Sequence, residues 1–430
     1  MSYDYRRVME SVQTYLSGNF STLLTDTQQQ GEIGSKLHRR IRTCLQNRFP
    51  QALEADGEVL VDRLYEDIAG YGCLGPYLRH LNSPEYRELY EINANRWNDI
   101  VLKFQSGEVR RLPETFLSGR HAADVIHRMS DAKGSQLDPV HAYAELDIAQ
   151  NVRLSVFVPP LVSEDSGTAF SIRIIRTSRT GNLYFVPQAL SQAMEDFLFA
   201  CIRYRIPLII GGEPGSGKTV LLNHLLQIIG RKYRIGAIEV HSRELGGLED
   251  KQFISLLAND QYSADDLLLG LLRQDCDYLV PQEMRDKEAY TAMEAAVTGM
   301  VLTSIHVAAL RLIWGRCATL ARKKVADDHA TLTQQAMDAF PIAVFMKRGD
   351  DDRFRVAEIA EGIRFDRQTN LPVYQSLFRF HTQENMTETG GKTKTIGNFE
   401  RVGGISDNLQ ELMRNHGAPE HLIQEFAVKG

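Results

Sequence analysis

The octapeptide GEPGSGKT, from Gly212 to Thr219, constrains this chain more than any other feature. It fits the pattern G-x-x-x-x-G-K-[ST] of a phosphate-binding loop. An apolar run, 206–210, precedes it, and leucines at helical spacing follow it, which is the strand–loop–helix context that the motif requires. Backbone N–H groups of such a loop and the following helix N-terminus attract phosphate oxygens. The sequence therefore predicts that the chain binds a nucleoside triphosphate.

The residue types within the loop predict a role for each position. Lys218 would reach the β- and γ-phosphates, and the Thr219 hydroxyl would hold Mg²⁺. The other predicted nucleotide contacts are Gly212, Glu213, Pro214, Gly215, Ser216 and Gly217. ATP and Mg²⁺ are thus the expected ligands.

Composition limits the classes of protein to consider. A chain of 430 residues is long enough for two or three domains. Its net charge of −6 argues against an overall positive electrostatic field that would attract nucleic acid. The beginning is too polar for a signal peptide, and the longest apolar run, Ala339 to Met346, is far shorter than the ~20 residues that span a bilayer. The five cysteines have no metal-ligand spacing, so we expect reduced thiols in a cytoplasmic protein whose membrane contact is peripheral.

The patterning changes twice along the chain. Residues 1–70 have amphipathic helical patterning, and Lys36 to Arg42 forms a basic patch that is either a solvated face or a contact for acidic lipid or a partner. Residues 71–180 show short alternating strands, which predict a separate α+β domain. From 181 to 430 strands and helices alternate, and this rhythm predicts an α/β domain with a parallel sheet, followed by a C-terminal appendage of strands and a small helical tail.

Three candidate catalytic groups follow predicted strands of this α/β domain. Glu283 ends the segment 277–283, and Arg285, two residues on, could neutralise phosphate charge or pair with it. His306 ends the strand that begins near Val301, and we expect it to sense the γ-phosphate. Glu239 ends the strand after the phosphate-loop helix and is a candidate water-polarising acid, with Glu244 as the alternative. Glu283 is also a candidate partner for Mg²⁺, together with Thr219.

Two arginines precede the connection to the α/β domain. Arg173 and Arg176 lie in a segment that alternates apolar and basic residues, Ser171 to Arg176. A nucleotide site between two domains would use such arginines on the phosphates or on the base, whereas a solvated strand face is the alternative interpretation.

These motifs, in this order, resemble the secretion ATPase superfamily of type II and type IV secretion and of type IV pili, and most closely its CpaF/TadA branch. The resemblance runs from about Tyr71 to the C-terminus and is carried by the phosphate loop and by the following segments: Glu91-Ile92-Asn93, Leu271-Leu272-Arg273, Glu283-Met284-Arg285, Thr298-Gly299, Ile305-His306 and Gly403-Gly404-Ile405. It implies a RecA-like P-loop NTPase core after a smaller α+β domain and a helical extension.

The resemblance also implies how such a chain works. It implies a homo-hexameric ring in which ATP lies between the two domains, hydrolysis moves them, and work reaches inner-membrane platform proteins of a secretion, conjugation or pilus machine. Lys218 and Thr219 would bind phosphates and Mg²⁺, Glu283 would be the catalytic or Mg²⁺-linked acid, Glu239 the acidic-box carboxylate, His306 the histidine-box sensor and Arg285 a phosphate-side arginine. The protein would work at the inner face of the cytoplasmic membrane.

The sequence departs from that family at several positions. The family usually has glycine before the acid, where this chain has Gln282, and its acidic pair reads Glu-Asp, where Val240 follows Glu239. Anchoring on Arg243-Glu244-Leu245 instead aligns Val240 and His241 with the acidic pair. Two further functions therefore stay open: a nucleotide-binding regulatory subunit with little hydrolysis, and a RecA-like nucleic-acid translocase, against which the acidic charge argues.

Overall fold

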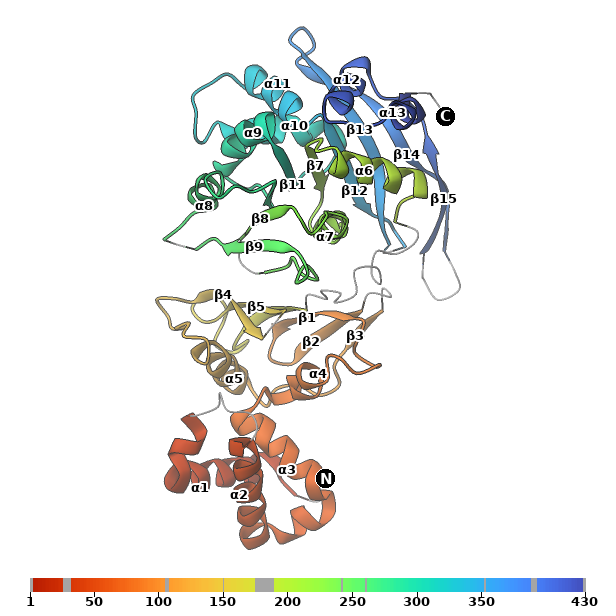
Figure 1. Ribbon diagram of the computed structural model, residues 1–430. Helices are drawn as coiled ribbons and strands as arrows, with labels where there is room; N and C mark the ends of the chain where they lie inside the picture. The colour runs from red at the N-terminus through yellow and green to blue at the C-terminus, as the bar shows by residue number, and fades with distance from the viewer. Residues whose placement is uncertain are drawn as a thin grey trace. The chain divides into compact units, whose positions relative to one another are not determined.

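The computed structural model describes residues 3–25, 32–104, 108–149, 151–174, 189–240, 243–259, 261–351, 353–387 and 393–427. The chain divides into two compact units, Met1–Arg176 and Thr177–Gly430 (Figure 1). Each unit is described by itself. The predicted domain boundary at residue 180 lies outside the described residues.

Three helices open the N-terminal unit, as the amphipathic pattern predicts. They are α1 (Tyr5–Thr25), α2 (Glu32–Arg48) and α3 (Pro50–Ala69). Apolar residues spaced three or four apart place one stripe of each helix in a shared core, where Val12, Ile41 and Leu64 are fully buried. Of the predicted basic patch on α2, Lys36, Arg39 and Arg40 are exposed.

An antiparallel sheet forms the second half of the N-terminal unit. Its spatial order is β3-β2-β1-β6-β5-β4. The strands are β1 (Leu89–Arg96), β2 (Asp99–Phe104), β3 (Val109–Arg111), β4 (Tyr143–Ala149), β5 (Val152–Phe157) and β6 (Ala169–Ile174). The short helices η1 (Gly72–Leu74) and α4 (Gly75–Arg79) precede β1, and α5 (Gly119–Asp131) contributes Ala122, Val125 and Ile126 to the sheet's core.

A nine-stranded mixed sheet is the centre of the C-terminal unit. Its spatial order is β15-β14-β13-β12-β7-β11-β10-β8-β9; β12 to β9 in this order run parallel, and β13 to β15 are antiparallel. The strands are β7 (Leu208–Gly212), β8 (Arg234–Glu239), β9 (Gln252–Leu257), β10 (Tyr278–Pro281), β11 (Met300–His306), β12 (Ile342–Arg348), β13 (Phe354–Asp366), β14 (Leu371–Thr387) and β15 (Thr393–Arg401).

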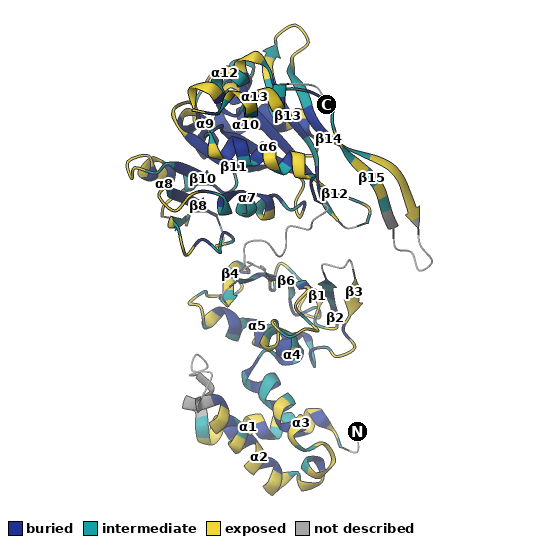
Figure 2. Cartoon of the chain, turned by 45° about the vertical axis from the view of Figure 1, so that its right-hand side comes forward, coloured by how far each residue is buried: buried dark blue, intermediate teal, exposed yellow. Residues whose placement is uncertain are grey.

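Helices pack on both faces of this sheet, because its central strands are apolar on both sides. Leu208 and Ile210 of β7 lie in one hydrophobic cluster, with α6 (Gln192–Arg203), α7 (Lys218–Gln227), α12 (Asp407–Asn415) and α13 (Glu420–Ala427). Ile209 points to the other cluster, with α8 (Ala264–Leu271), α9 (Glu288–Thr298), η2 (Leu310–Leu312), α10 (Ile313–Ala321) and α11 (His329–Ala339). Figure 2 shows the central strands as buried.

The coarse architecture predicted from the sequence is confirmed: helices first, then an antiparallel sheet, then an α/β unit with a parallel core. Ser191 and Ser263 cap α6 and α8, where their hydroxyl oxygens accept hydrogen bonds from backbone N–H groups. The pattern missed β9, α5 and α11, and gave no sign that β13 to β15 extend the parallel core as an antiparallel wing. None of the helices in the described part of the chain is long and apolar enough to cross a membrane.

A buried polar cluster joins α8 to α9 and α10. The Asp265 carboxylate is 4 % exposed and accepts hydrogen bonds from Lys324 Nζ (2.8 Å to each oxygen) and from Thr291 Oγ1 (2.5 Å). Lys324 Nζ also donates to Thr291 Oγ1 at 2.7 Å. These bonds tie α8 to α9 and to the segment that follows α10.

We expect Asp265→Ala to lower the free energy of unfolding of the C-terminal unit by about 3 kcal/mol, because it leaves the Lys324 ammonium without its buried partner. Urea titration followed by circular dichroism measures this. Asp327→Ala, which changes an exposed aspartate after α10, is the matched control and should leave the transition unchanged. Equal transitions for both variants would contradict a stabilising role for the cluster.

Candidate active site

The phosphate loop connects β7 to α7 as the motif requires. Gly215 and Gly217 have φ values of +71° and +91°, which favour glycine, and no described atom lies within 4 Å of the place where a Cβ on Gly215 would stand. The Ser216 hydroxyl oxygen is buried and has no hydrogen-bond partner among the described residues. A polar atom left without a partner inside a glycine-rich loop fits a phosphate ligand.

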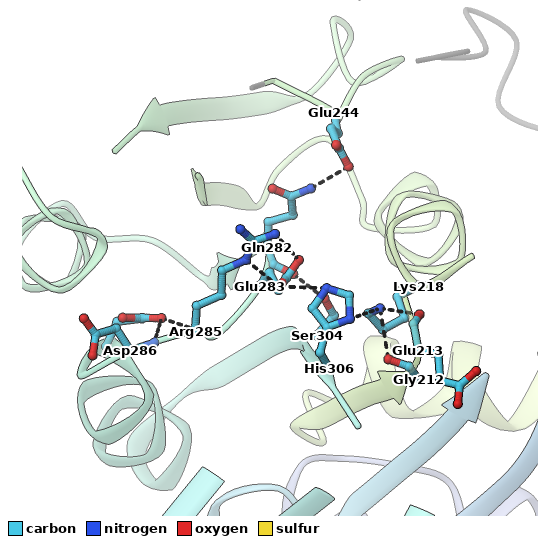
Figure 3. A network of polar contacts seen from close by, with 11 residues as sticks. Gly212, Glu213, Lys218, Glu244, Gln282, Glu283, Arg285, Asp286, Ser304 and His306 are labelled. Carbon is cyan, nitrogen blue, oxygen red and sulfur yellow. Dashed lines mark hydrogen bonds and ion pairs between the residues drawn. The ribbon is translucent and has the colours of Figure 1, made fainter. Parts of the chain in front are cut away.

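A chain of polar contacts runs from the loop to the neighbouring strand ends (Figure 3). Lys218 Nζ donates to the carbonyl oxygens of Gly212 (3.1 Å) and Glu213 (3.0 Å) and to His306 Nδ1 (3.1 Å). His306 Nε2 lies 3.0 Å from Glu283 Oε1. The sheet explains the meeting, because β11 lies between β7 and β10 and pairs His306 with Gly212.

The direction of these contacts assigns the His306 tautomer. An ammonium group donates and cannot accept, so His306 Nδ1 carries the lone pair and Nε2 carries the proton given to Glu283. His306 thus connects the phosphate-loop lysine to the acid at the end of β10. Sequence reasoning predicts these residues at one sheet edge, and the structure brings Lys218, His306, Glu283 and Arg285 together there.

Glu283 is held as a carboxylate. Burial alone would raise its pKa, but hydrogen bonds from His306 and Arg285, with the positive charge of the Arg285 guanidinium, lower the pKa to about 2. Arg285 Nε donates to Oε1 at 2.5 Å, and Arg285 Nη2 donates to Oε2 at 3.1 Å. A base with so low a pKa accepts protons weakly, so the carboxylate suits a cation or the orientation of water better than proton abstraction.

The backbone around Glu283 is fixed by its neighbours. Thr303 Oγ1 donates to the Pro281 carbonyl at 2.6 Å, and the backbone N–H of Met284 donates to the Ser304 carbonyl at 2.8 Å. The buried Glu288 carboxylate accepts from the backbone N–H groups of Arg285 (2.5 Å) and Asp286 (2.8 Å). Sequence reasoning gave Glu288 no such role; an acid in the first turn of a helix is the signal that could have indicated it.

Glu239 is enclosed by the loop that follows β8 and by β9. Its side chain is fully buried at the end of β8, where Oε1 accepts from the backbone N–H groups of Glu244 and Leu245, and Oε2 accepts from Ser255 Oγ at 2.5 Å. The contacts of Glu239 thus lie within the loop after β8 and on β9, and none of them joins the chain from Lys218 to Glu283. Burial raises the pKa of Glu239, and these hydrogen bonds oppose the rise.

We expect Glu239→Gln to leave the melting temperature at pH 7.5 unchanged or higher. A raised pKa in the fold means that the Glu239 contribution to stability is present below its ordinary value of 4.5 and is lost as pH rises through the folded value. The amide keeps an acceptor for the loop N–H groups and removes the buried charge. Thermal melts from pH 5 to 7.5 should fall less steeply for the variant, and a steeper fall would contradict this.

Glu244, the alternative acid, contacts the residue that precedes Glu283. Its Oε2 accepts a hydrogen bond from Gln282 Nε2 at 2.9 Å, and Gln282 immediately precedes Glu283 (Figure 3). Gln282 itself was missed as a site residue, because nothing in the sequence pattern shows that a glutamine after a buried strand points to a distant loop. This contact links Glu244 to the residue before Glu283, and a catalytic role for either Glu239 or Glu244 stays a prediction.

The residues present fit Mg²⁺ in the manner usual for nucleotide sites. Mg²⁺ binds through one or two protein oxygens together with substrate phosphates and water, and Thr219 at the start of α7 and Glu283 supply such oxygens. Among the described residues no group of three or more His, Cys, Asp or Glu side chains could hold a metal without a substrate.

The two candidate arginines of the N-terminal unit are only partly described. Arg173 lies in β6 with an exposed side chain, opposite Glu91 of β1. Arg176 falls outside the described residues. Their role on a nucleotide stays a prediction.

Comparisons with known proteins agree with these motifs. Residues 127–327, just under half of the chain, match the family described as Type II/IV secretion system protein. The conjugal transfer protein TrbB of Rhizobium radiobacter is 29 % identical over 224 residues, covering 49 % of this chain and 65 % of TrbB. Protein VirB11 of the same organism is 32 % identical over 113 residues, covering 25 % of this chain and 32 % of VirB11.

Solved structures were also similar: the ATPase DotB of Legionella pneumophila has a TM-score of 0.46 and 17 % identity, covering 68 % of this chain and 80 % of DotB. These sequence matches show that the chain is similar to type II/IV secretion system proteins over part of its length. The segment that matches the family includes the phosphate loop, Glu283 and His306.

Proposed function

We propose that this chain is an ATPase that hydrolyses ATP to ADP and phosphate and works as a motor for secretion, conjugation or Tad-type pilus assembly. The observation that carries the proposal is the contact chain from Lys218 through His306 to Glu283, built at the carboxyl edge of a parallel sheet. Ligands bind at this edge in open α/β sheets. The match of residues 127–327 to Type II/IV secretion system proteins supports the same reaction.

Each group has a distinct part in the proposed reaction. The loop N–H groups, Ser216 and Lys218 bind phosphate oxygens, and Lys218 then exchanges its carbonyl contacts for the β- and γ-phosphates. Thr219 and Glu283 would hold Mg²⁺, and the ion would neutralise phosphate charge when bound. Arg285 neutralises charge that develops on the γ-phosphate side, and Glu244 orients the attacking water.

In this proposal, the contacts of His306 change when nucleotide binds at the phosphate loop. When Lys218 turns toward a γ-phosphate, His306 Nδ1 loses its donor, and the contact between His306 and Glu283 can rearrange. Loss of this contact would free one oxygen of Glu283 for the cation or for water. The coupling needs only the three side chains already in contact.

The proposal extends to the assembly and its place in the cell. We infer a homo-hexamer with a RecA-like core, of the CpaF/TadA branch, that works in the cytoplasm at the inner membrane against platform proteins. Arg173 and Arg176 would contribute to binding of the nucleotide. Peripheral membrane contact fits the exposed Lys36, Arg39 and Arg40 of α2, and stable nucleic-acid binding is not expected at a net charge of −6.

The test is ATP turnover by the purified protein, with light scattering after size exclusion on the same sample, with and without Mg²⁺. We expect Mg²⁺-dependent phosphate release by a species near six subunits. If the protein binds ATP but releases no phosphate, with or without lipid vesicles, it would instead be a regulatory subunit. Tight, salt-sensitive DNA binding would favour a translocase.

A further inference from the structure

Gln282 is a buried polar residue that the phosphate-loop chemistry does not use. Its side chain is 7 % exposed, and its amide Nε2 donates to Glu244 Oε2 at 2.9 Å. Its backbone is fixed on both sides, because its N–H donates to the Ile238 carbonyl at 2.9 Å and its carbonyl accepts from Ser304 Oγ at 2.7 Å. The amide is therefore aimed from a rigid position between β8 and β11.

We propose that Gln282 is a positioning residue for ATP hydrolysis, whose amide holds the Glu244 carboxylate beside the strand end that carries Glu283. The proposal rests on the ATPase function proposed above. It adds a buried side chain to which the proposed reaction has so far given no part.

Glu244 is held through both its backbone and its side chain. Its backbone N–H and that of Leu245 donate to the buried Glu239 carboxylate, which Ser255 Oγ holds in turn. The side chain is then directed by Gln282. Glu239 thus fixes where the loop lies, and Gln282 fixes where the carboxylate of that loop points, so Glu244 reaches the site with little rotamer freedom left to lose.

The chemistry of the pair explains why an amide suits this place. A neutral donor stabilises the carboxylate form of Glu244 without introducing a cation that would compete for phosphate or Mg²⁺. Glu283 is already bound by His306 and Arg285. Glu244 supplies a second carboxylate, which the neutral Gln282 amide orients for the attacking water.

The first test compares Gln282→Ala with Gln252→Ala. Gln252 begins β9 at the opposite, amino end of the parallel strands, and its amide donates to the backbone carbonyls of Arg231 and Lys232, so it is a matched control. We expect Gln282→Ala to lower kcat about ten-fold with KM for Mg²⁺-ATP within about two-fold of wild type. We expect Gln252→Ala to retain wild-type kcat and KM.

A second test separates positioning from mere packing. In the double variant Gln282→Glu with Glu244→Gln, the hydrogen bond can re-form with donor and acceptor exchanged, but the charge moves to the other residue. We expect the melting temperature of the double variant to return to the wild-type value while kcat stays as low as in Glu244→Gln alone. In Gln282→Glu alone, two carboxylates face each other, so the acid limb of the kcat–pH profile should move up by about one pH unit.

The outcomes distinguish this proposal from the function on which it rests. If wild type and Gln252→Ala both fail to turn over ATP, the ATPase function fails and takes this proposal with it. If wild type turns over ATP and Gln282→Ala matches it in kcat and pH profile, only the positioning role fails. Recovery of full kcat by the double variant would likewise overturn it, because the location of the charge would then be irrelevant.

Discussion

Lys218→Ala should reduce ATP turnover by about a hundred- to a thousand-fold. The variant removes the only ammonium that the described residues place at the phosphate loop, where it contacts the carbonyls of Gly212 and Glu213 and the His306 ring. Removing one preorganised group that stabilises developing charge typically costs about two to three orders of magnitude in rate. Phosphate release at saturating Mg²⁺-ATP measures the effect.

The control for this change is Lys232→Ala, which removes an exposed lysine between α7 and β8. It should leave turnover at the wild-type value. Circular dichroism of both variants should match wild type, since Lys218 contacts the loop rather than the hydrophobic clusters. Unchanged turnover in Lys218→Ala would show that the chemistry takes place elsewhere and would remove the site assignment.

Glu283→Gln should keep nucleotide binding and lose hydrolysis by about a hundred-fold or more. The amide has nearly the same shape, so the fold and the phosphate loop stay intact, but it carries no charge for Mg²⁺ or water and pairs poorly with Arg285. Binding of a fluorescent ATP analogue and single-turnover hydrolysis, measured on one sample, separate the two effects. Loss of binding in this variant would make Glu283 a residue for binding or folding instead.

The pH dependence gives an independent check on Glu283. Its folded pKa of about 2 lies below its ordinary 4.5, so its contribution to stability is present above pH 4.5 and is lost as pH falls toward 2. Acid unfolding of wild type should therefore be steeper over that range than acid unfolding of Glu283→Gln. The exposed Glu249→Gln should follow wild type both in acid unfolding and in turnover.

Much of the fold could be predicted because its signals are local. Ser191 and Ser263 mark the starts of α6 and α8, where their hydroxyls accept from backbone N–H groups three residues on. The apolar run before the phosphate loop becomes β7, buried along its length. Strands were expected in the C-terminal appendage, but the antiparallel pairing of β13 to β15 was not, because the direction in which a strand pairs depends on a distant neighbour.

The candidate site divides in the same way. The positions of Glu283 and His306 could be predicted because each lies at a strand end. Glu283 follows β10, His306 ends β11, and β11 lies between β10 and β7 in the sheet. The choice between Glu239 and Glu244 could not, because it depends on how the loop after β8 folds back so that its N–H groups reach the Glu239 carboxylate. The role of Gln282 could not be predicted for the same reason, since its hydrogen-bond partner, Glu244, is 38 residues away in the chain.

The sequence by itself determined the phosphate loop, because eight consecutive residues set a backbone path that needs no distant contact. It also determined the order of helices and strands, which follows from the periodicity of apolar residues. Only the tertiary structure decided which acid is connected to Lys218. Strand register places His306 in contact with both Lys218 and Glu283, whereas Glu239 is fully buried among hydrogen-bond donors of its own loop and of β9. A side chain at a strand end takes its direction from its neighbours across the sheet, and those neighbours are far away in the sequence.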